Sequence, residues 1–292
     1  MIRAITLVLF TSLFTLLTAD SIKIYSSASQ EELSFSKLVK ELKAYDVVFF
    51  GEFHDNVELH KLEEKLFKAM LKKNKSVALS LEMFERDVQN TLDSYLNNGI
   101  EDAEFLANSR PWPNYDPDYK PLIELAKKFK APVIAANVPR RHASGVHANG
   151  SEYMDQIPEE EKAFVAKELK VLDDEYKKRF IDTMKIGMSS GMHKKPSMNF
   201  DKIYAAQCLK DDTMAESIFN FLKTNPDSKV LHINGDFHSN SHLGTAQKLQ
   251  IMNPDLKIAV LTPQLRAPDN KEAFSEKVFT SGDYILRVPV YE

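Results

Sequence analysis

The sequence predicts an α/β protein with a mainly parallel sheet that is flanked by helices. Short apolar runs typical of buried strands alternate along the chain with longer stretches that have the apolar spacing of helices. Two of the apolar runs are followed by near-copies of one hexapeptide, GEFHDN at 51–56 and GDFHSN at 235–240. The composition agrees with a globular domain, since 43% of the 292 residues are hydrophobic and 27% are charged.

The predicted core strands are short, mainly apolar runs, as expected for strands that are buried on both faces of a sheet. They are residues 46–50, 76–81, 131–138, 230–233, 257–262 and 284–288. Residues 26–36 are polar and are predicted to be a loop that leads into the first helix. After the first core strand, Asp55 or Asn56 is expected to cap a helix.

A helical insertion is predicted between the two halves of the sheet, at about residues 151–222. No apolar run with strand character occurs there, and residues 159–180 and 201–221 have helical spacing. The stretch 184–198 between them is rich in Met and contains His193.

The N-terminus has the layout of a secretory signal peptide. Arg3 precedes an uncharged apolar run that ends at Ala19 and is short for a membrane span, so an uncleaved anchor is the weaker alternative. The single cysteine of the sequence, Cys208, is far from this run, so a lipid-modified N-terminus is not expected. We therefore expect a signal peptide at 1–19 and an α/β domain at 20–292, exported to the periplasm or cell envelope.

The charge balance gives no reason to expect nucleic acid as a partner. The chain has 38 basic and 42 acidic residues and a net charge of −4. A nucleic-acid-binding domain usually carries a basic patch or stripe.

The hexapeptide copies place an acid and a histidine at the end of two predicted strands. Because ligands bind at the carboxyl ends of the strands in open α/β sheets, Glu52, His54, Asp236 and His238 are expected to converge. A third acid, Glu82, follows another predicted strand. The alternative is that both copies are ordinary strand-to-helix turns, with Gly at the bend and Asn as the helix cap.

This set of side chains suits two kinds of chemistry. Two imidazoles with two or three carboxylates can bind a divalent metal. They can also act as general acids and bases, since crowded carboxylates raise one another's pKa. No Ser or Cys lies in a nucleophile-elbow context, so acyl-enzyme chemistry has no evident nucleophile. A metal-dependent or acid–base hydrolase is one functional hypothesis.

Two further features of the chain leave their role open. Arg140 and Arg141 follow the strand predicted at 131–138, where they suit an anion or simply a surface ion pair. The loop around Trp112 is rich in Pro and is expected either to form a pocket wall or to pack the indole on the core.

The helical insertion suggests a different ligand. A Met-rich segment that bears a histidine can wrap a flat apolar molecule, and haem iron accepts His, Tyr or Met as an axial ligand. His193, Tyr176 and Tyr204 lie in this part of the chain. The alternative is that the Met residues fill gaps in the core.

Four blocks in order resemble the ChaN family, which consists of haem-binding, iron-regulated proteins of bacterial cell envelopes. They are GEFHDN at 51–56, LEMF at 81–84, AQCLKDDTMA at 206–215 and GDFHSN at 235–240. The resemblance runs from about residue 49 to the end of the chain. The family belongs to a wider group similar to the erythromycin esterases and the TIKI proteases, in which the His and Glu of the equivalent motifs lie at a catalytic or metal site.

The resemblance implies a haem-binding protein that takes part in haem or iron acquisition. It implies a homodimer that holds haem between subunits, with a tyrosine on the iron and a histidine from the other subunit nearby, and components of envelope haem uptake as partners. Tyr204 and Tyr176 are the expected tyrosines and His193 the expected histidine. Many relatives are lipoproteins, and this sequence lacks the cysteine for that modification.

Overall fold

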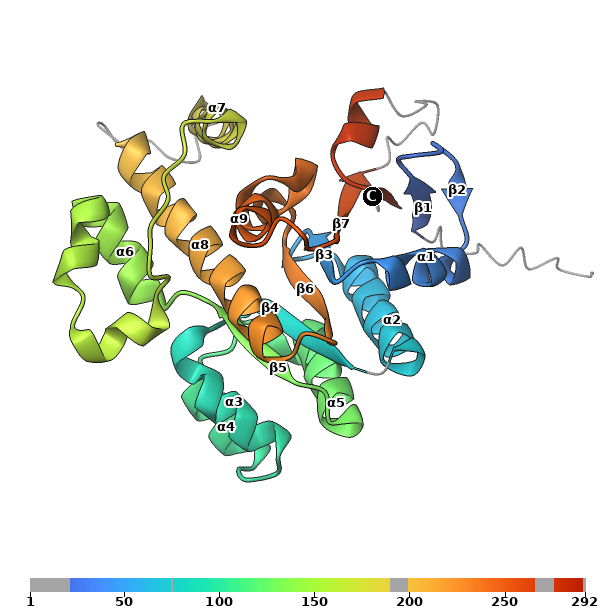
Figure 1. The fold of residues 1–292 in the computed structure, drawn as a ribbon, viewed down its shortest axis with the longest axis horizontal. Helices are drawn as coiled ribbons and strands as arrows, with labels where there is room; N and C mark the ends of the chain where they lie inside the picture. Colours follow the sequence, from blue (N-terminus) through green and yellow to red (C-terminus); the bar gives the residue numbers. More distant parts are fainter. Residues whose placement is uncertain (1–21, 75, 190–198, 266–275, 291–292) are drawn as a thin grey trace, which may run out of the picture.

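A mixed sheet forms the centre of the molecule (Figure 1). The structure is a computed structural model that describes residues 22–74, 76–189, 199–265 and 276–290. The predicted signal peptide and His193 lie outside these residues. In the described residues the strand order is β2-β1-β8-β7-β3-β6-β4-β5. The strands are β1 Lys23–Ser26, β2 Glu32–Leu33, β3 Val47–Glu52, β4 Val77–Glu85, β5 Val133–Asn137, β6 Lys229–Gly235, β7 Ile258–Leu265 and β8 Tyr284–Val288.

Strands β3 to β8 run parallel to one another, which confirms the predicted mainly parallel sheet. The two N-terminal strands differ, because β1 pairs antiparallel with both β8 and β2. The loop predicted at 26–36 contains β2 and the end of β1. These strands are short and lie at the edge of the sheet, so each buries only one or two apolar side chains, such as Ile24 and Leu33. That is too few to give a periodic signal in the sequence.

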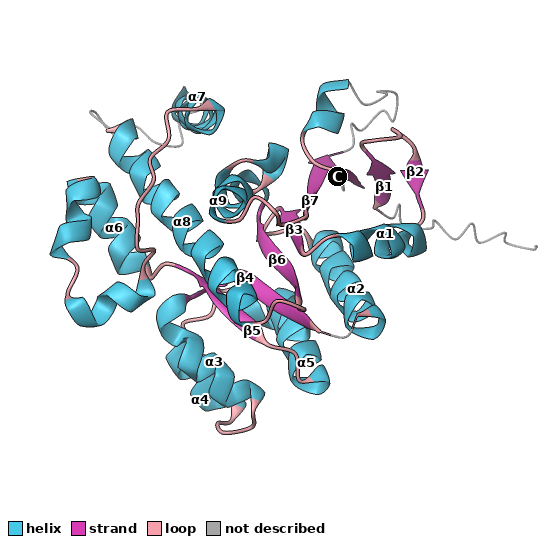
Figure 2. Cartoon of the chain, viewed as in Figure 1, coloured by secondary structure: helices cyan, strands magenta, loops and turns pink. Residues whose placement is uncertain are grey.

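Helices cover both faces of the sheet (Figure 2). On β3, Val48 and Phe50 pack in the same cluster as residues of α2, whereas Val47 and Phe49 face α8 and α9. Burial on both faces explains the continuous apolar runs. The helices are α1 Phe35–Glu41, α2 Val57–Lys73, α3 Gln89–Leu96, α4 Asp102–Ser109, α5 Lys120–Phe129, α6 Arg140–Asn149, α7 Glu175–Ser189, α8 Phe200–Thr224 and α9 Gly244–Met252.

The order of the strands brings the two hexapeptides together. Strand β6 lies between β3 and β4, although β4 follows β3 in the chain. Glu52 at the end of β3 pairs with Gly235 at the end of β6, and β4 with Glu82 lies on the other side of β6. The carboxyl ends of three neighbouring strands therefore carry the acids and imidazoles that the sequence singled out.

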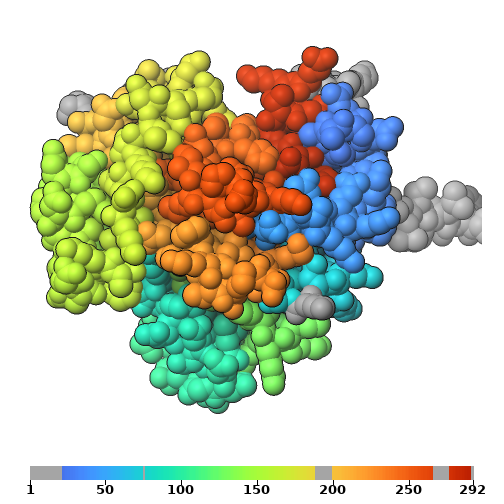
Figure 3. All heavy atoms as spheres, in the orientation of Figure 1, coloured from blue at the N-terminus to red at the C-terminus, as the bar shows by residue number. Residues whose placement is uncertain are grey.

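The described residues between β5 and β6 form helices and no strand. They include α6, two turns of 3₁₀ helix at Ser151–Gln156 and Glu159–Phe164, α7 and the long helix α8. Helix α6 packs against α8, and its yellow-green residues lie on the left flank of the molecule in the space-filling view (Figure 3). Helix α8 also packs on β5 and so forms part of the layer that covers the sheet. None of the described helices combines the length and the apolar character that a membrane span needs.

Candidate functional site

The first hexapeptide forms a carboxylate–imidazole pair at the end of β3. Glu52 is buried, and its Oε1 accepts hydrogen bonds from His54 Nδ1 at 2.7 Å and from the Tyr119 hydroxyl at 2.6 Å. The His54 side chain remains 40% exposed. Trp112 meets it edge-on, with ring centroids 5.0 Å apart, so the Pro-rich loop forms a wall beside this imidazole.

The second hexapeptide places His238 between two carboxylates. His238 ends a short 3₁₀ turn that follows β6, and its Nδ1 lies 2.7 Å from Asp211 Oδ1. Its Nε2 lies 3.3 Å from Glu82 Oε1. Asp211 comes from α8, is fully buried, and also accepts hydrogen bonds from the Thr245 hydroxyl at 2.8 Å and the Tyr176 hydroxyl at 2.9 Å.

Glu82 lies between the Glu52–His54 pair and the Asp211–His238 pair. It does not end its strand in the way that the sequence predicts, because β4 is longer. The strand continues to Glu85, but its pairing with β5 shifts between Leu81 and Glu85. Such an irregularity re-aims side chains. Glu82 lies within it, and its Oε2 accepts a hydrogen bond from the Gly235 amide at 2.8 Å.

The two glycines are required by close approach of side chains from the opposite copy. A Cβ on Gly235 would lie 2.7 Å from His54 Nε2 and 3.6 Å from Glu82 Oε2. A Cβ on Gly51 would lie 2.5 Å from Asp236 Oδ1. His54 Nε2 and the Glu82 carboxylate therefore flank the same small space above Gly235.

Asp236 does not join the other predicted residues. Its Oδ2 accepts a hydrogen bond from Asn240 Nδ2 at 2.6 Å, and its Oδ1 faces Gly51. Side chains of neighbouring residues on a strand point to opposite faces, so Asp236 lies on the face opposite to Glu52. Burial raises the pKa of Asp236 to about 6. The structure thus brings together Glu52, His54, Glu82 and His238, and leaves Asp236 outside this cluster.

Neighbouring carboxylates raise the pKa of both imidazoles, and exposure to solvent distinguishes them. For His238, burial disfavours the charged ring, but Glu82 and Asp211 outweigh it and raise the pKa to about 10. Burial likewise opposes the ionisation of Glu82, yet His238 holds the pKa of this carboxyl well below its usual range. For His54, burial is outweighed by the hydrogen bond to Glu52 and the charge of Glu82, and the pKa rises. His238 is therefore charged at neutral pH and enclosed by carboxylates, whereas the His54 ring is partly exposed to solvent.

A second buried cluster lies beneath Glu52. Asn56 caps α2 by accepting from the Leu59 amide, and the first turns of this helix carry His60 and Glu63. His60 Nδ1 lies 3.1 Å from Glu63 Oε2 and 3.5 Å from Glu52 Oε2. Of the described residues, Glu52, His60 and Glu63 form the group of potential metal ligands whose atoms all lie within 4.8 Å of one another. It shares only Glu52 with the strand-end cluster, for which the sequence left metal binding and acid–base chemistry as alternatives.

The strand-end cluster is less suited to one ion as it lies. Asp211 and Glu82 contact opposite nitrogens of the His238 ring. A single ion cannot bind both carboxylates and this ring unless the ring turns.

The sequence analysis did not identify Asp211 and His60 as site residues, although the position of each on its helix indicates burial. Asp211 follows Tyr204 and Cys208 at helical spacing on the buried face of α8. His60 and Glu63 lie on the buried face of α2 beside Leu59 and Leu66 in the same way. A charged residue on the apolar face of a helix is almost never buried unless it is paired, so it points to a partner that the fold supplies.

The tyrosines proposed for haem lie in an aromatic cluster next to His238. Tyr176 on α7 and Tyr204 on α8 pack with Phe180 and Phe237, and they are only 2% and 1% exposed. Burial, with the charge of Asp211, raises the pKa of Tyr176 well above its ordinary value. Burial and the neighbouring Cys208 raise the pKa of Tyr204. The third residue of this prediction, His193, is outside the described residues.

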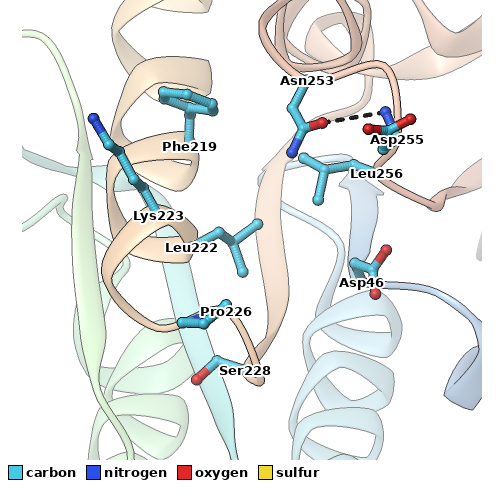
Figure 4. A pocket seen from close by; sticks show the side chains of 9 residues that line it. All are labelled: Asp46, Phe219, Leu222, Lys223, Pro226, Ser228, Asn253, Asp255 and Leu256. Atoms are coloured by element: carbon cyan, nitrogen blue, oxygen red, sulfur yellow. Dashed lines mark hydrogen bonds between the residues drawn. The ribbon is translucent and has the colours of Figure 1, made fainter.

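Other candidate features lie away from these clusters. Arg141 pairs with Asp87 at 2.7 Å and with Glu161 at 3.0 Å, as the ion-pair interpretation expects. A pocket of about 380 Å³ opens at the amino ends of the strands, where Asp46 and Ser228 precede β3 and β6 (Figure 4). It is at the opposite end of the sheet from His54 and His238.

Comparison with known proteins identifies the family. A protein-family model described as haem-binding uptake, Tiki superfamily, ChaN, matches residues 38–249. The chain belongs to the ChaN family. The four sequence blocks quoted above lie within the matched range, which confirms the resemblance that they indicated.

The chain is also similar to solved structures, and the first of them shares its fold. A structure of cofacial haem binding to ChaN of Campylobacter jejuni superposes with a TM-score of 0.70 at 22% identity, and the match covers 91% of this chain and 96% of that one. A mutant of the erythromycin esterase EreC in its open conformation gives a TM-score of 0.47 at 11% identity, over 84% of this chain and 77% of its own. No curated protein sequence matches the chain.

Proposed function

We propose that this protein binds haem and takes part in haem or iron acquisition in the periplasm or cell envelope. Membership of the ChaN family carries the proposal. The signal-like sequence at 1–19 supports export. The Campylobacter jejuni relative, which binds haem cofacially, supports haem held between two copies of the chain.

The aromatic cluster of α7 and α8 fits one requirement of a haem site. Tyr176, Phe180, Tyr204 and Phe237 form an apolar surface beside the strand ends, and apolar and aromatic side chains line most cofactor pockets. A tyrosine hydroxyl is a suitable axial ligand for haem iron. The cluster joins the segment that contains His193, since α7 and α8 flank residues 190–198.

Access to either hydroxyl requires α7 to move. Both phenols are buried, and the Tyr176 hydroxyl is bonded to Asp211, which also holds His238. Ligation by Tyr176 would therefore break a contact of the strand-end cluster. Ligation by Tyr204 would instead require that Tyr176 and Phe180, which pack against its ring, be displaced and that its hydrogen bond with Cys208 be broken.

A haemin titration of the chain from Asp20 onward tests the proposal. We expect a saturable Soret band and a shift to a dimer in size-exclusion chromatography. We expect Tyr176→Phe or Tyr204→Phe, whichever removes the ligand, to lower haemin affinity at least tenfold and to change the spectrum, and His193→Ala to weaken binding.

Tyr95→Phe is the matched control for this titration. Tyr95 is also a buried, hydrogen-bonded tyrosine, but it packs in the cluster on the other face of the sheet. This variant should bind haemin as the unchanged protein does. Haemin binding no tighter than to an unrelated protein would refute the haem proposal, and unchanged binding by all three site variants would refute the assignment of these residues.

A hydrolase that uses the strand-end cluster is a second candidate function. The observation in its favour is that His54 Nε2 and Glu82 Oε2 flank one small space, with His238 as a fixed cation next to Glu82. In such a site His54 would transfer protons to and from the substrate, a role that contributes about 10²–10⁴-fold to rate. His238 would keep the Glu82 carboxylate ionised and in place.

For any ester or peptide that the protein hydrolyses, Gly235→Ala is expected to lower kcat/KM about 10²-fold or more. The added Cβ displaces His54, which is exposed enough to move, so the fold should persist. Gly187→Ala is the control, because a Cβ there meets no atom within 4 Å. Equal activities of the two variants would exclude His54 as the acid–base group, and a screen without any turnover would leave haem binding as the sole function.

A further inference from the structure

The cluster of Glu52, His60 and Glu63 has the composition of a buried metal site. The side chains come from the end of β3 and the first turns of α2, and they are 2%, 4% and 0% exposed. His60 and Glu63 are three residues apart on one helix, so both project toward Glu52.

Two carboxylate oxygens in this cluster lack a hydrogen-bond donor. Glu52 Oε2 and Glu63 Oε1 are buried and have no hydrogen-bond partner among the described residues. A buried acceptor without a donor destabilises a fold by about 1–3 kcal/mol, and more when it is charged. A positive group between these oxygens would remove that penalty.

The orientation of His60 indicates where such a group lies. His60 Nε2 donates to the His54 carbonyl oxygen at 3.0 Å, and a carbonyl can only accept, so Nε2 carries a hydrogen. Burial disfavours the charged ring, but Glu63 and Glu52 outweigh it and raise the pKa of His60 to about 9, so without an ion Nδ1 carries a proton that faces Glu63. An ion that displaced this proton would meet the Nδ1 lone pair between the carboxylates of Glu52 and Glu63. This is the arrangement of metal-binding histidines, in which the second nitrogen donates to a carbonyl or carboxylate and fixes the ring.

The distances within the cluster agree with ligation of one ion. Ligand atoms that each lie about 2.1 Å from an ion stand about 3.0–3.4 Å apart at octahedral or tetrahedral angles. His60 Nδ1 lies 3.1 Å from Glu63 Oε2 and 3.5 Å from Glu52 Oε2. The other oxygen of Glu52 is already held by Tyr119 and His54, which fixes the carboxylate in place.

We propose that Glu52, His60 Nδ1 and Glu63 bind one divalent transition-metal ion. One imidazole and two carboxylates match Zn²⁺ or Mn²⁺, whereas Ca²⁺ and Mg²⁺ prefer ligand sets made of oxygen alone. The two carboxylates balance the charge of the ion. The site is separate from the aromatic cluster proposed for haem, and it is linked to the strand ends through Glu52, whose Oε1 contacts His54.

Zinc binding by the full chain tests this inference. The protein, freed of affinity tag and of metal by a chelator, is titrated with Zn²⁺ alone, and bound zinc is measured by elemental analysis after gel filtration. We expect one equivalent of zinc per chain and a rise of Tm on adding zinc. Glu63→Gln should lower zinc affinity more than a hundredfold and abolish the rise of Tm.

Two further variants test whether zinc binding depends on this cluster. Tyr119→Phe removes a hydrogen bond to Glu52 but no ligand, and it should lower zinc affinity about 10–100-fold. Glu161→Gln is the control, since it alters another Glu–His contact, at His142, and should leave zinc binding unchanged. Circular dichroism of each metal-free variant checks that it is folded.

Three outcomes would overturn the inference. If the unchanged protein and Glu63→Gln bound zinc with equal affinity, the zinc site would lie outside the Glu52, His60 and Glu63 cluster. Zinc that is lost with His54→Gln but retained with Glu63→Gln would belong to the strand-end cluster. Absence of stoichiometric zinc and manganese, with Glu63→Gln more stable than the unchanged protein, would mean that a proton shared by the two carboxyls occupies the position instead.

Discussion

Replacing His238 with glutamine is expected to lower the free energy of unfolding at pH 6 by about 3–5 kcal/mol. The imidazolium lies between Glu82 and Asp211, which are 5% and 0% exposed. Without it, two carboxylates stay buried and close together with no cation between them. Breaking a buried ion pair from one side is strongly destabilising, because the remaining charge is left uncompensated.

Urea unfolding of the two proteins measures this effect, and His147→Gln is the control. His147 is an exposed residue of α6, so its replacement should change the free energy of unfolding by no more than about 0.5 kcal/mol. A loss below about 1 kcal/mol for His238→Gln would mean that the hydrogen bonds from Gly235, Thr245 and Tyr176 suffice for the two carboxylates. The imidazolium would then not be a main support of the strand-end cluster.

Much of the fold follows from features that are local in the sequence. Strands β3 to β8 were predictable because burial on both faces demands continuous apolar runs, as in the run that ends at Phe50. The insertion of β6 between β3 and β4 is set by packing of the whole sheet and leaves no mark in either hexapeptide. The same holds for β1 and β2, which are held at the edge by pairing with β8 and with each other.

The repeated motif predicted the cluster in part, because equal spacing does not give equal geometry. Glu52 is still within β3, whereas Asp236 begins the 3₁₀ turn after β6. The two hexapeptides are also out of register by one residue in the sheet. Gly51, the first residue of one copy, pairs with Asn234, which precedes the first residue of the other. The acid of the second copy therefore turns toward Asn240, and Asp211 from α8 supports His238 instead. A partner from a helix more than twenty residues away can only be found once the fold is known.

The stability of the protein is expected to fall as pH rises from about 6.5 to about 10. In the unfolded chain the pKa of His238 is near 6.5, and in the folded chain Glu82 and Asp211 raise it to about 10 against the opposing effect of burial. Between these values the folded state holds a proton that the unfolded state has lost, so stability decreases with pH. Each pKa unit of difference contributes about 1.4 kcal/mol, which makes the total a few kcal/mol.

Glu82 makes the stability depend on pH in the opposite direction at low pH. Because its pKa is lowered in the folded chain, its contribution to stability is present above about pH 4.5 and is lost in acid.

The difference between the unchanged protein and His238→Gln isolates this effect, because groups that titrate alike in both proteins cancel. The gap in unfolding free energy should be widest near pH 6 and should narrow steadily toward pH 9. An NMR titration of the His238 ring gives an independent reading, since its carbon-bound protons should keep the shifts of the charged form up to about pH 9. Parallel stability curves, or a ring that loses its proton near pH 6.5, would show that Glu82 and Asp211 do not hold His238 as a cation. In that case neither the fixed positive charge assigned to the strand-end cluster nor the division of roles between His238 and His54 would stand.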